Sequence, residues 1–505
     1  MKQRPFPIAL LAALALAACN HDNPDARFAE AKKAFAAEDY AHARSAVLAA
    51  LDGARGNRDM LLLLARSNLA LHDGEGAGAA LARLADAGMN GPEWNEMAAE
   101  AALWRGRPKD MADLLKDDQS PAAWRLRGEA ALADNDSAAA LADFQRGMAA
   151  GGADFRLAAD YARFLIDAAD IDGAERALAV MRNAGSDRID TLLITGEIAQ
   201  ARGQLDAAGR AFADAAARFP ARVEPLLALA YLADLRGDTA ATARLSDQAA
   251  AIAPRDPKVV SLIVMVAEEA NNWAKVRDLL APHETTLDLR SADGLSYGAA
   301  LLNLGHAEAA RAIFQKALLL SQQNPYARLM LAKCDLAVGD GSGAMQTIRP
   351  LADSVLAGEQ ELDVAIRAAT MAHDPALPGY QQRRASPQLA MIAATAGAAT
   401  AAMGRRDWAA ALAALRTIPG ADRDPEVLKR LALAASNLGQ ADAALAYADH
   451  ALELDPRNPD MLHIAGLVRI NAGRDRGLAQ SLLRQALERD PANRLFRADL
   501  ARAGV

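Results

Sequence analysis

Small residues return every 34 positions through the middle of this chain. Between about residues 121 and 358 this series passes through Gly128, Ala162, Gly196, Ala230, Val264, Gly298 and Ala332. A second series with the same period is mostly large and apolar and consists of Phe144, Leu178, Phe212, Ser246, Leu280, Phe314 and Ile348. A fixed period of this length is typical of stacked supersecondary units, because each unit covers the apolar face of its neighbour.

Residues 189–222 show the pattern inside one unit. Gly196 lies on a first apolar segment, and Ala208 and Phe212 lie on a second. Small side chains let two helix axes approach closely, and a phenylalanine fills the space beside them. Glycine can end a helix in the left-handed backbone conformation, and the expected turn glycines are Gly203, Gly237, Gly305, Gly339, Gly404, Gly439 and Gly473. The sequence therefore predicts one helical hairpin per unit.

The period, with Gly196, Ala208, Phe212 and Pro220 in their places, resembles the tetratricopeptide repeat. The resemblance implies an all-α fold, a right-handed α-solenoid of helix-turn-helix repeats. In that family, ligand contacts come from positions two, five, nine and twelve of the first helix, on the concave face. Carried onto this chain, the resemblance implies a partner-binding face that includes Glu197, Tyr231, Asp234, Met265, Glu268, Tyr326 and Lys333. The alternative, that several of these side chains only contact a neighbouring helix, stays open.

The repeats cover nearly the whole chain, with one interruption. We expect an N-terminal solenoid over 26–373, a C-terminal repeat segment over 389–492 and a capping helix over 493–505. Residues 374–388 between them hold three prolines and a glycine, so an irregular loop is expected there. This segment is either a degenerate repeat with a surface loop, or a hinge or docking loop that presents Tyr380, Arg383 and Arg384.

The first residues have the composition of a targeting signal. Lys2 and Arg4 precede an apolar run, Ile8–Ala18, that is too short to span a bilayer. The run ends in the letters LAAC, which resemble the lipobox of bacterial lipoproteins. An ordinary secretory leader with a chance cysteine is the alternative.

The lipobox resemblance implies a signal peptide over 1–18, a lipidated Cys19 and a tether over 19–25. Two or more acyl chains make membrane anchoring stable. In enterobacterial lipoproteins an aspartate after the cysteine retains the protein in the inner membrane, and this chain has Asn20 instead. We therefore expect a periplasm-facing protein anchored to the outer membrane, with the inner membrane as the alternative.

The motifs of zinc proteases, nucleotide-binding enzymes and dithiol sites do not occur in the sequence. HExxH, Walker and CxxC patterns are absent, and the eight histidines are scattered. Cys334 is the only cysteine besides Cys19, so a lipidated Cys19 leaves no intrachain disulfide, and we expect Cys334 to be buried. The charge of -8 is well mixed along the chain and shows no footprint for nucleic acid. We expect no enzyme activity, no metal and no cofactor.

These observations predict a lipid-anchored scaffold for protein–protein interactions in a bacterial envelope machine. Similar tetratricopeptide lipoproteins occur with exopolysaccharide export, with the exosortase (PEP-CTERM) sorting system and with outer-membrane assembly, so the resemblance implies a protein partner from such a machine. A glycan- or peptidoglycan-binding protein and a regulatory subunit of a synthase are the alternatives. The aromatic share of 4% leaves few rings for sugar stacking. No oligomeric state follows from the sequence.

Overall fold

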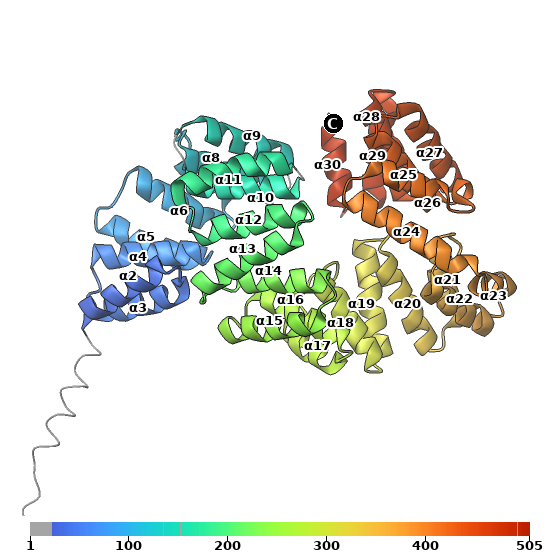
Figure 1. Ribbon diagram of the computed structural model, residues 1–505, viewed down its shortest axis with the longest axis horizontal. Coiled ribbons are helices and arrows are strands. Elements are labelled where there is room, and N and C mark those ends of the chain that lie inside the picture. The colour runs from blue at the N-terminus through green and yellow to red at the C-terminus, as the bar shows by residue number, and fades with distance from the viewer. Residues whose placement is uncertain (1–22, 135, 152–153, 169, 492, 505) are drawn as a thin grey trace, which may run out of the picture. The chain divides into compact units, whose positions relative to one another are not determined.

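The computed structural model describes residues 23–134, 136–151, 154–168, 170–491 and 493–504, which form helices α2–α30 with no strand among them (Figure 1). The predicted all-α class is confirmed. The leader, Cys19 and most of the tether lie outside the described residues. In the part that is described, every helix is too short or too polar to cross a membrane.

The chain divides into two compact units, Met1–Ile263 and Val264–Val505, which we call unit 1 and unit 2. The division falls within α16 (Pro257–Glu269). The other helices of unit 1 are α2 (Pro24–Ala36), α3 (Tyr40–Gly53), α4 (Arg58–Ala70), α5 (Gly74–Asp86), α6 (Pro92–Trp104), α7 (Pro108–Leu114), α8 (Pro121–Ala133), α9 (Ser137–Ala149), α10 (Phe155–Asp167), α11 (Ile171–Gly185), α12 (Ile189–Ala201), α13 (Leu205–Arg218), α14 (Glu224–Leu235) and α15 (Thr239–Ile252).

Unit 2 continues the series of hairpins and includes two short 3₁₀ helices. Its elements are α17 (Trp273–Leu280), η2 (Ala281–His283), α18 (Ala292–Asn303), α19 (Ala307–Leu320), α20 (Pro325–Ala337), α21 (Gly341–Ala352), α22 (Glu359–Ala372), α23 (Leu377–Arg384), α24 (Gln388–Gly404), α25 (Trp408–Arg416), η3 (Ala421–Arg423), α26 (Pro425–Asn437), α27 (Ala441–Leu454), α28 (Pro459–Ala472), α29 (Arg476–Arg489) and α30 (Arg494–Arg502). The predicted boundary at 374–388 lies inside this unit rather than between the two units.

Inside a hairpin, the small residue of the first helix meets the large residue of the second. A Cβ atom placed on Gly196 would lie 2.2 Å from Cε1 of Phe212, which is closer than real Cβ atoms approach. Phe212 is 1% exposed, so its ring fills the space that the glycine leaves. The same pairing occurs twice more: a Cβ atom on Gly128 would lie 2.6 Å from Phe144, and one on Gly298 would lie 2.8 Å from Phe314. These contacts confirm the register that the 34-residue period predicts.

The second helices start at capped turns. Asp73 and Asp170 accept hydrogen bonds at 2.8 Å from the backbone N–H groups of Gly76 and Gly173, which satisfies a free donor of the first turn. A positive φ confirms the turn prediction at Gly203, Gly237, Gly305, Gly339, Gly439 and Gly473. It is wrong for Gly404, which lies in α24, because Arg406 takes the left-handed conformation there with φ 58°.

The irregular loop expected over 374–388 has to be corrected, because Leu377–Arg384 form the helix α23. Pro378 lies in the first turn of α23, where a missing N–H breaks no hydrogen bond of the helix. The number of prolines in a segment is therefore a weaker signal than their position within a possible helix.

The basic and aromatic side chains of α23 contact other residues of unit 2. Tyr380 is 3% exposed, and its hydroxyl donates to Oδ1 of Asp353 at 2.6 Å. Arg383 donates to two backbone carbonyl groups at and just after the end of α21, those of Ala352 and Ser354. Arg384 pairs with carboxylates of α22. These contacts count against the alternative of a docking loop that presents the three side chains.

The first helices of successive hairpins also contact one another. This holds for α4 with α6 and α10 with α12 in unit 1, and for α20 with α22 and α26 with α28 in unit 2. The second helices mainly contact the helices that adjoin them in sequence. A stack whose first helices lie closer together curves towards them, so we call the side formed by the first helices the inner face of each unit.

Candidate partner-binding interface

Polar pairs join successive first helices along the inner faces. Arg66 of α4 donates to Glu93 of α6 at 2.7 Å, and these residues are 27 positions apart. The same spacing joins Lys333 of α20 to Gln360 of α22 at 3.2 Å. In repeat positions, residue nine of one first helix contacts residue two of the next. These pairs hold side chains that the family resemblance assigns to ligand binding.

A continuous network of ion pairs crosses the inner face of unit 1. We call it the charge ladder, and it consists of Glu100, Arg125, Glu129, Arg156, Asp160, Arg163 and Asp190. Arg125 donates to Glu100 at 3.1 Å and lies 3.6 Å from Asp160. Arg156 donates to both oxygens of Glu100. Arg163 lies 3.7 Å from Asp160 and donates to Asp190.

The centre of the charge ladder is buried, since the side chains of Glu100 and Arg125 are 1% and 2% exposed. Buried charges need close partners because they lose the stabilisation of water. Burial alone would raise the pKa of Glu100, but hydrogen bonds from Arg156 and the charge of Arg125 bring it below its ordinary value. Glu100 is therefore an ionised anchor of this network.

Glu129 behaves differently from Glu100. Burial raises its pKa to about 8 despite the charge of Arg125, and the adjacent Asp160 carboxylate adds to the rise. Its Oε1 accepts from Arg125 at 2.5 Å, while Oε2 is buried and has no hydrogen-bond partner among the described residues. The charge ladder therefore holds a carboxyl group that changes its charge near neutral pH.

The pairing of polar residues 27 positions apart on successive first helices, which we call the 27-residue pairing, fails at Glu197 of α12. The residue 27 positions on is Glu224, another acid, and its carboxylate is already held by Arg222 at 2.6 Å. Within the described residues Glu197 makes no hydrogen bond and no ion pair. Burial raises the pKa of Glu197, and the charge of Arg163 offsets this only in part. The inner face therefore carries a partly buried carboxyl group that no cation contacts in a hydrogen bond or ion pair among the described residues.

Tyr231 and Asp234 lie one hairpin further along unit 1. Tyr231 occupies the same repeat position on α14 as Glu197 occupies on α12, and it is 41% exposed. Asp234 follows on the same helix and is half-buried. The structure thus places the three predicted residues of unit 1 on two neighbouring first helices.

The four predicted residues of unit 2 make contacts inside that unit. Glu268 accepts from the hydroxyl of Ser296 at 2.6 Å. Tyr326 is 39% exposed, and burial together with the Glu268 charge raises its pKa to about 12. Lys333 donates to Gln360, and Met265 is half-buried. The seven predicted residues therefore belong to two units and do not form one described site.

Position five of the first helices contributes mainly to the core. Leu193, Leu227 and Leu329 are 5%, 5% and 7% exposed, so they do not face a ligand. Sequence reasoning also missed most of the charge ladder, including Arg125 and Arg156. A search for opposite charges 27 positions apart would have found the Arg163–Asp190 pair and the gap at Glu197.

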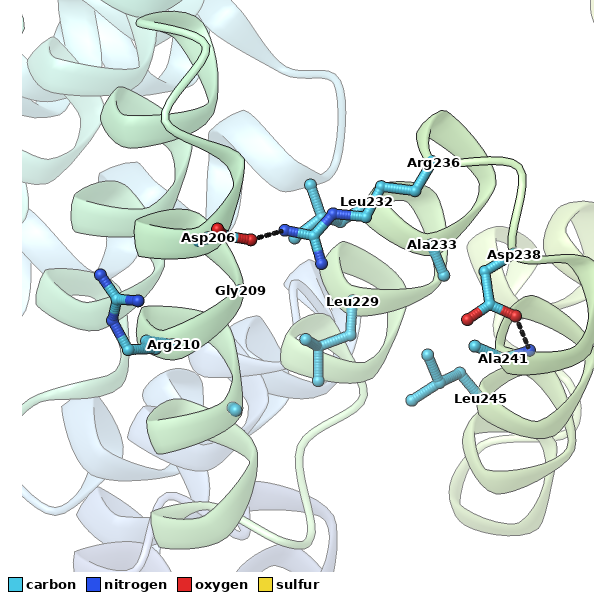
Figure 2. A pocket seen from close by; sticks show the side chains of 11 residues that line it. Asp206, Gly209, Arg210, Leu229, Leu232, Ala233, Arg236, Asp238, Ala241 and Leu245 are labelled. Atoms are coloured by element: carbon cyan, nitrogen blue, oxygen red, sulfur yellow. Dashed lines mark hydrogen bonds and ion pairs between the residues drawn. The ribbon is translucent and has the colours of Figure 1, made fainter.

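The outer side of unit 1 carries a separate groove of about 460 Å³ between α13, α14 and α15 (Figure 2). Leu229, Leu232 and Leu245 line it, and Gly209 leaves one wall open. Arg236 donates to Asp206 at 2.8 Å across its rim. None of the predicted site residues lines this groove.

The described residues contain no group of three or more side chains that could hold a metal ion. Two tryptophans of unit 1 take part in internal contacts. The guanidinium groups of Arg127 and Arg146 lie 4.5 and 5.2 Å from the ring centre of Trp124. The indole N–H of Trp94 donates to the backbone oxygen of Leu81 at 3.1 Å.

Comparison with known proteins identifies the repeat type. Two family models, both described as tetratricopeptide repeat, match residues 301–355 and 426–458. No curated protein matches the chain.

Several solved structures are similar in fold. The Cut9–Hcn1 structure of the APC/C matches at 15% identity with a TM-score of 0.37, covering 98% of this chain and 99% of that chain. Yeast Tom70 matches at 15% identity with a TM-score of 0.33, covering 73% and 98%. A tetratricopeptide repeat protein from Parabacteroides merdae matches at 11% identity with a TM-score of 0.33, covering 52% and 97%. At these identities the similarity concerns the fold alone.

Tetratricopeptide repeat proteins are typically non-catalytic and mediate protein–protein interactions. The described helices thus form an α-solenoid of helical hairpins that contains tetratricopeptide repeats at residues 301–355 and 426–458, a fold that suggests an interaction scaffold.

Proposed function

We propose that the protein is a non-catalytic, lipid-anchored scaffold that binds a segment of a partner protein on the inner face of unit 1. The partner belongs to a bacterial envelope machine for polysaccharide export, protein sorting or outer-membrane assembly. The lipobox-like residues before Cys19 support the anchor and the compartment. The repeat fold supports binding rather than catalysis.

The observation that carries the proposal is the interrupted pairing at Glu197. Neighbouring first helices satisfy their polar residues mutually where opposite charges face each other, as at Arg163 and Asp190. Glu197 lacks such a partner, and Tyr231 at the equivalent position of the next hairpin offers an aromatic surface.

A lysine or arginine of the partner would supply the missing charge at Glu197. A partly buried carboxylate gains from a close cation because water is largely absent around it. An adjacent ring can hold the aliphatic stem or the charged group of the same side chain. We therefore assign the partner segment at least one basic residue.

The anchor is tested by the variant Cys19→Ser, expressed with the native leader. We expect the variant to leave the membrane fraction after a salt wash, while the unmodified chain stays bound. Retention of the variant on washed membranes would contradict the lipid anchor.

The binding face is tested by placing a photocrosslinking residue at Tyr231 and, as a matched control, at Ala217 on the outer side of α13. We expect ultraviolet light to join an envelope protein to the Tyr231 variant but not to the Ala217 variant, and Glu197→Gln to reduce that product. Glycan without protein at Tyr231 would favour the glycan-binding alternative. Equal products from both positions would contradict the inner face as the binding site.

A further inference from the structure

Two turns of unit 1 that are 184 residues apart in sequence touch each other. Arg222, in the turn before α14, reaches Glu38, in the turn between α2 and α3, with an NH1–Oε2 distance of 3.5 Å. The same guanidinium group lies 5.3 Å from the ring centre of Tyr40. Unit 1 therefore curves far enough for its first hairpin to meet a later one. We call Glu38, Tyr40 and Arg222 the clasp.

The surrounding charges show that this approach extends beyond one contact. Glu38 lies within the electrostatic range of Arg188 and Asp190, at the start of α12, as well as of Glu224. His72, 34 residues after Glu38, is in turn influenced by Lys258 at the start of α16. Equivalent turns of the first two hairpins thus lie near the starts of the later first helices.

When the clasp separates, Arg222 keeps an ion pair. The shortest bond of Arg222 is to Glu224, at 2.6 Å, and this bond lies within its own turn. Tyr40 keeps an edge contact with Phe35 of its own hairpin, at 5.2 Å between ring centres. Burial raises the pKa of Glu38, so Arg222 does not fully compensate the lost hydration of that carboxylate.

The contact is also weak in kind. An ion pair of this length and a single cation–π contact are each modest contributions to stability. The hairpins between α3 and α13 form a solenoid in which small rotations per repeat add up. A slight change in each repeat is therefore enough to move the two turns apart.

We propose that the clasp is a releasable closure of the inner face of unit 1, which admits a partner segment when it opens. Glu197 and the charge ladder lie on the first helices that the closed curve encloses. The identity of the entering segment rests on the proposed function, whereas the opening of the clasp does not.

The test measures how fast a large reagent reaches the inner face. The full chain carries Cys19→Ser, so that Cys334, which is buried, is the only native thiol. Glu197→Cys then places a thiol on the inner face, and its reaction with a polyethylene glycol maleimide is followed by gel shift. Ala217→Cys, on the exposed side of α13, serves as the reference thiol.

Arg222→Glu should open the clasp, because it places a new acid beside Glu38, Asp190 and Glu224. We expect the thiol at position 197 to react about tenfold faster in this variant. This factor corresponds to the summed stability of the one ion pair and the one cation–π contact that the variant loses. Adding Glu38→Arg should restore the slow rate by reversing the pair. Arg236→Glu, which breaks a pair between adjacent helices, should change nothing.

Equal rates at position 197 in the parent and in Arg222→Glu would overturn the clasp. Modification of the buried Cys334 in Arg222→Glu would also overturn it, since that result means general unfolding. A rate that rises in Arg222→Glu and falls again in the reversed pair supports it, even if crosslinking at Tyr231 finds no protein. In that case the proposed function fails and the closure remains.

Discussion

The close contact between Gly196 and Phe212 predicts that a larger residue at position 196 destabilises the hairpin. In Gly196→Ala the new Cβ atom would sit 2.2, 2.6 and 2.7 Å from three carbons of the Phe212 ring. Carbon atoms in packed interiors are normally about 3.5–4.0 Å apart. Because the ring is 1% exposed, it has no free space into which it can move.

Two opposing terms decide the outcome of this substitution. Helix propensity favours alanine over glycine by about 1 kcal/mol in a helix interior. Overpacking a tight core costs about 1–3 kcal/mol, and the overlap here is at the severe end. We therefore expect Gly196→Ala to lower the free energy of unfolding by about 1–2 kcal/mol.

Gly209, on the partner helix α13, provides a matched control. A Cβ atom there would lie 3.4 Å from Cδ2 of Leu232 and 4.0 Å from Nη2 of Arg236, which are ordinary contacts, and would face the outer groove (Figure 2). Gly209→Ala should therefore leave stability unchanged or raise it by up to about 1 kcal/mol.

Thermal melting of the full chain and hydrogen exchange of α12 and α13 measure the difference. For a unit of this size, 1 kcal/mol corresponds to about 2–4 °C. Phe212→Leu added to Gly196→Ala should recover part of the loss, because it removes the ring that causes the overlap. A melting temperature for Gly196→Ala equal to or above that of Gly209→Ala would refute the reasoning.

Three further results are expected. Because burial raises the pKa of Glu129 from 4.5 to about 8, the folded state holds its proton over a range in which the unfolded chain has lost it, so stability falls as pH rises through this window. Melting curves of Glu129→Gln should therefore lose less stability than the parent between those values, and an equal loss would contradict the raised pKa. Tyr380→Phe should cost about 1–2 kcal/mol in denaturant titrations, because Asp353 loses its hydroxyl partner, and an unchanged midpoint would contradict this. Burial raises the pKa of Cys334 to about 12, so in Cys19→Ser a thiol reagent should modify this cysteine only after unfolding, and reaction in the native state would contradict its burial.

The hairpins could be predicted from the sequence because the contacts that form each hairpin join residues close to one another in the chain. Gly196 and Phe212 are 16 residues apart, and the glycine is required by the ring that covers it. Helix α23 was not predicted, because the rule that proline breaks helices depends on where in the helix the proline falls. Pro378 lies in the first turn, where the rule does not apply.

The inner face was predicted only in part. The repeat positions pointed to Glu197 and Tyr231, but they did not show which residues of that face are already paired between hairpins, such as Asp190 and Lys333. The clasp could not be predicted from local patterns. It depends on the curvature summed over many hairpins, to which every interface contributes a small angle.

The 27-residue pairing has a consequence for the ways in which such a gene can shorten or grow. Loss of residues 189–222 would bring Arg163 next to Glu224, a compatible pair of opposite charge. Loss of residues 155–188 would instead bring Glu129 next to Asp190, two acids. Repeats of equal length are thus not interchangeable, because the charge at each paired position is compatible only with certain neighbouring repeats. Recombination between repeats is therefore tolerated at some junctions and destabilising at others.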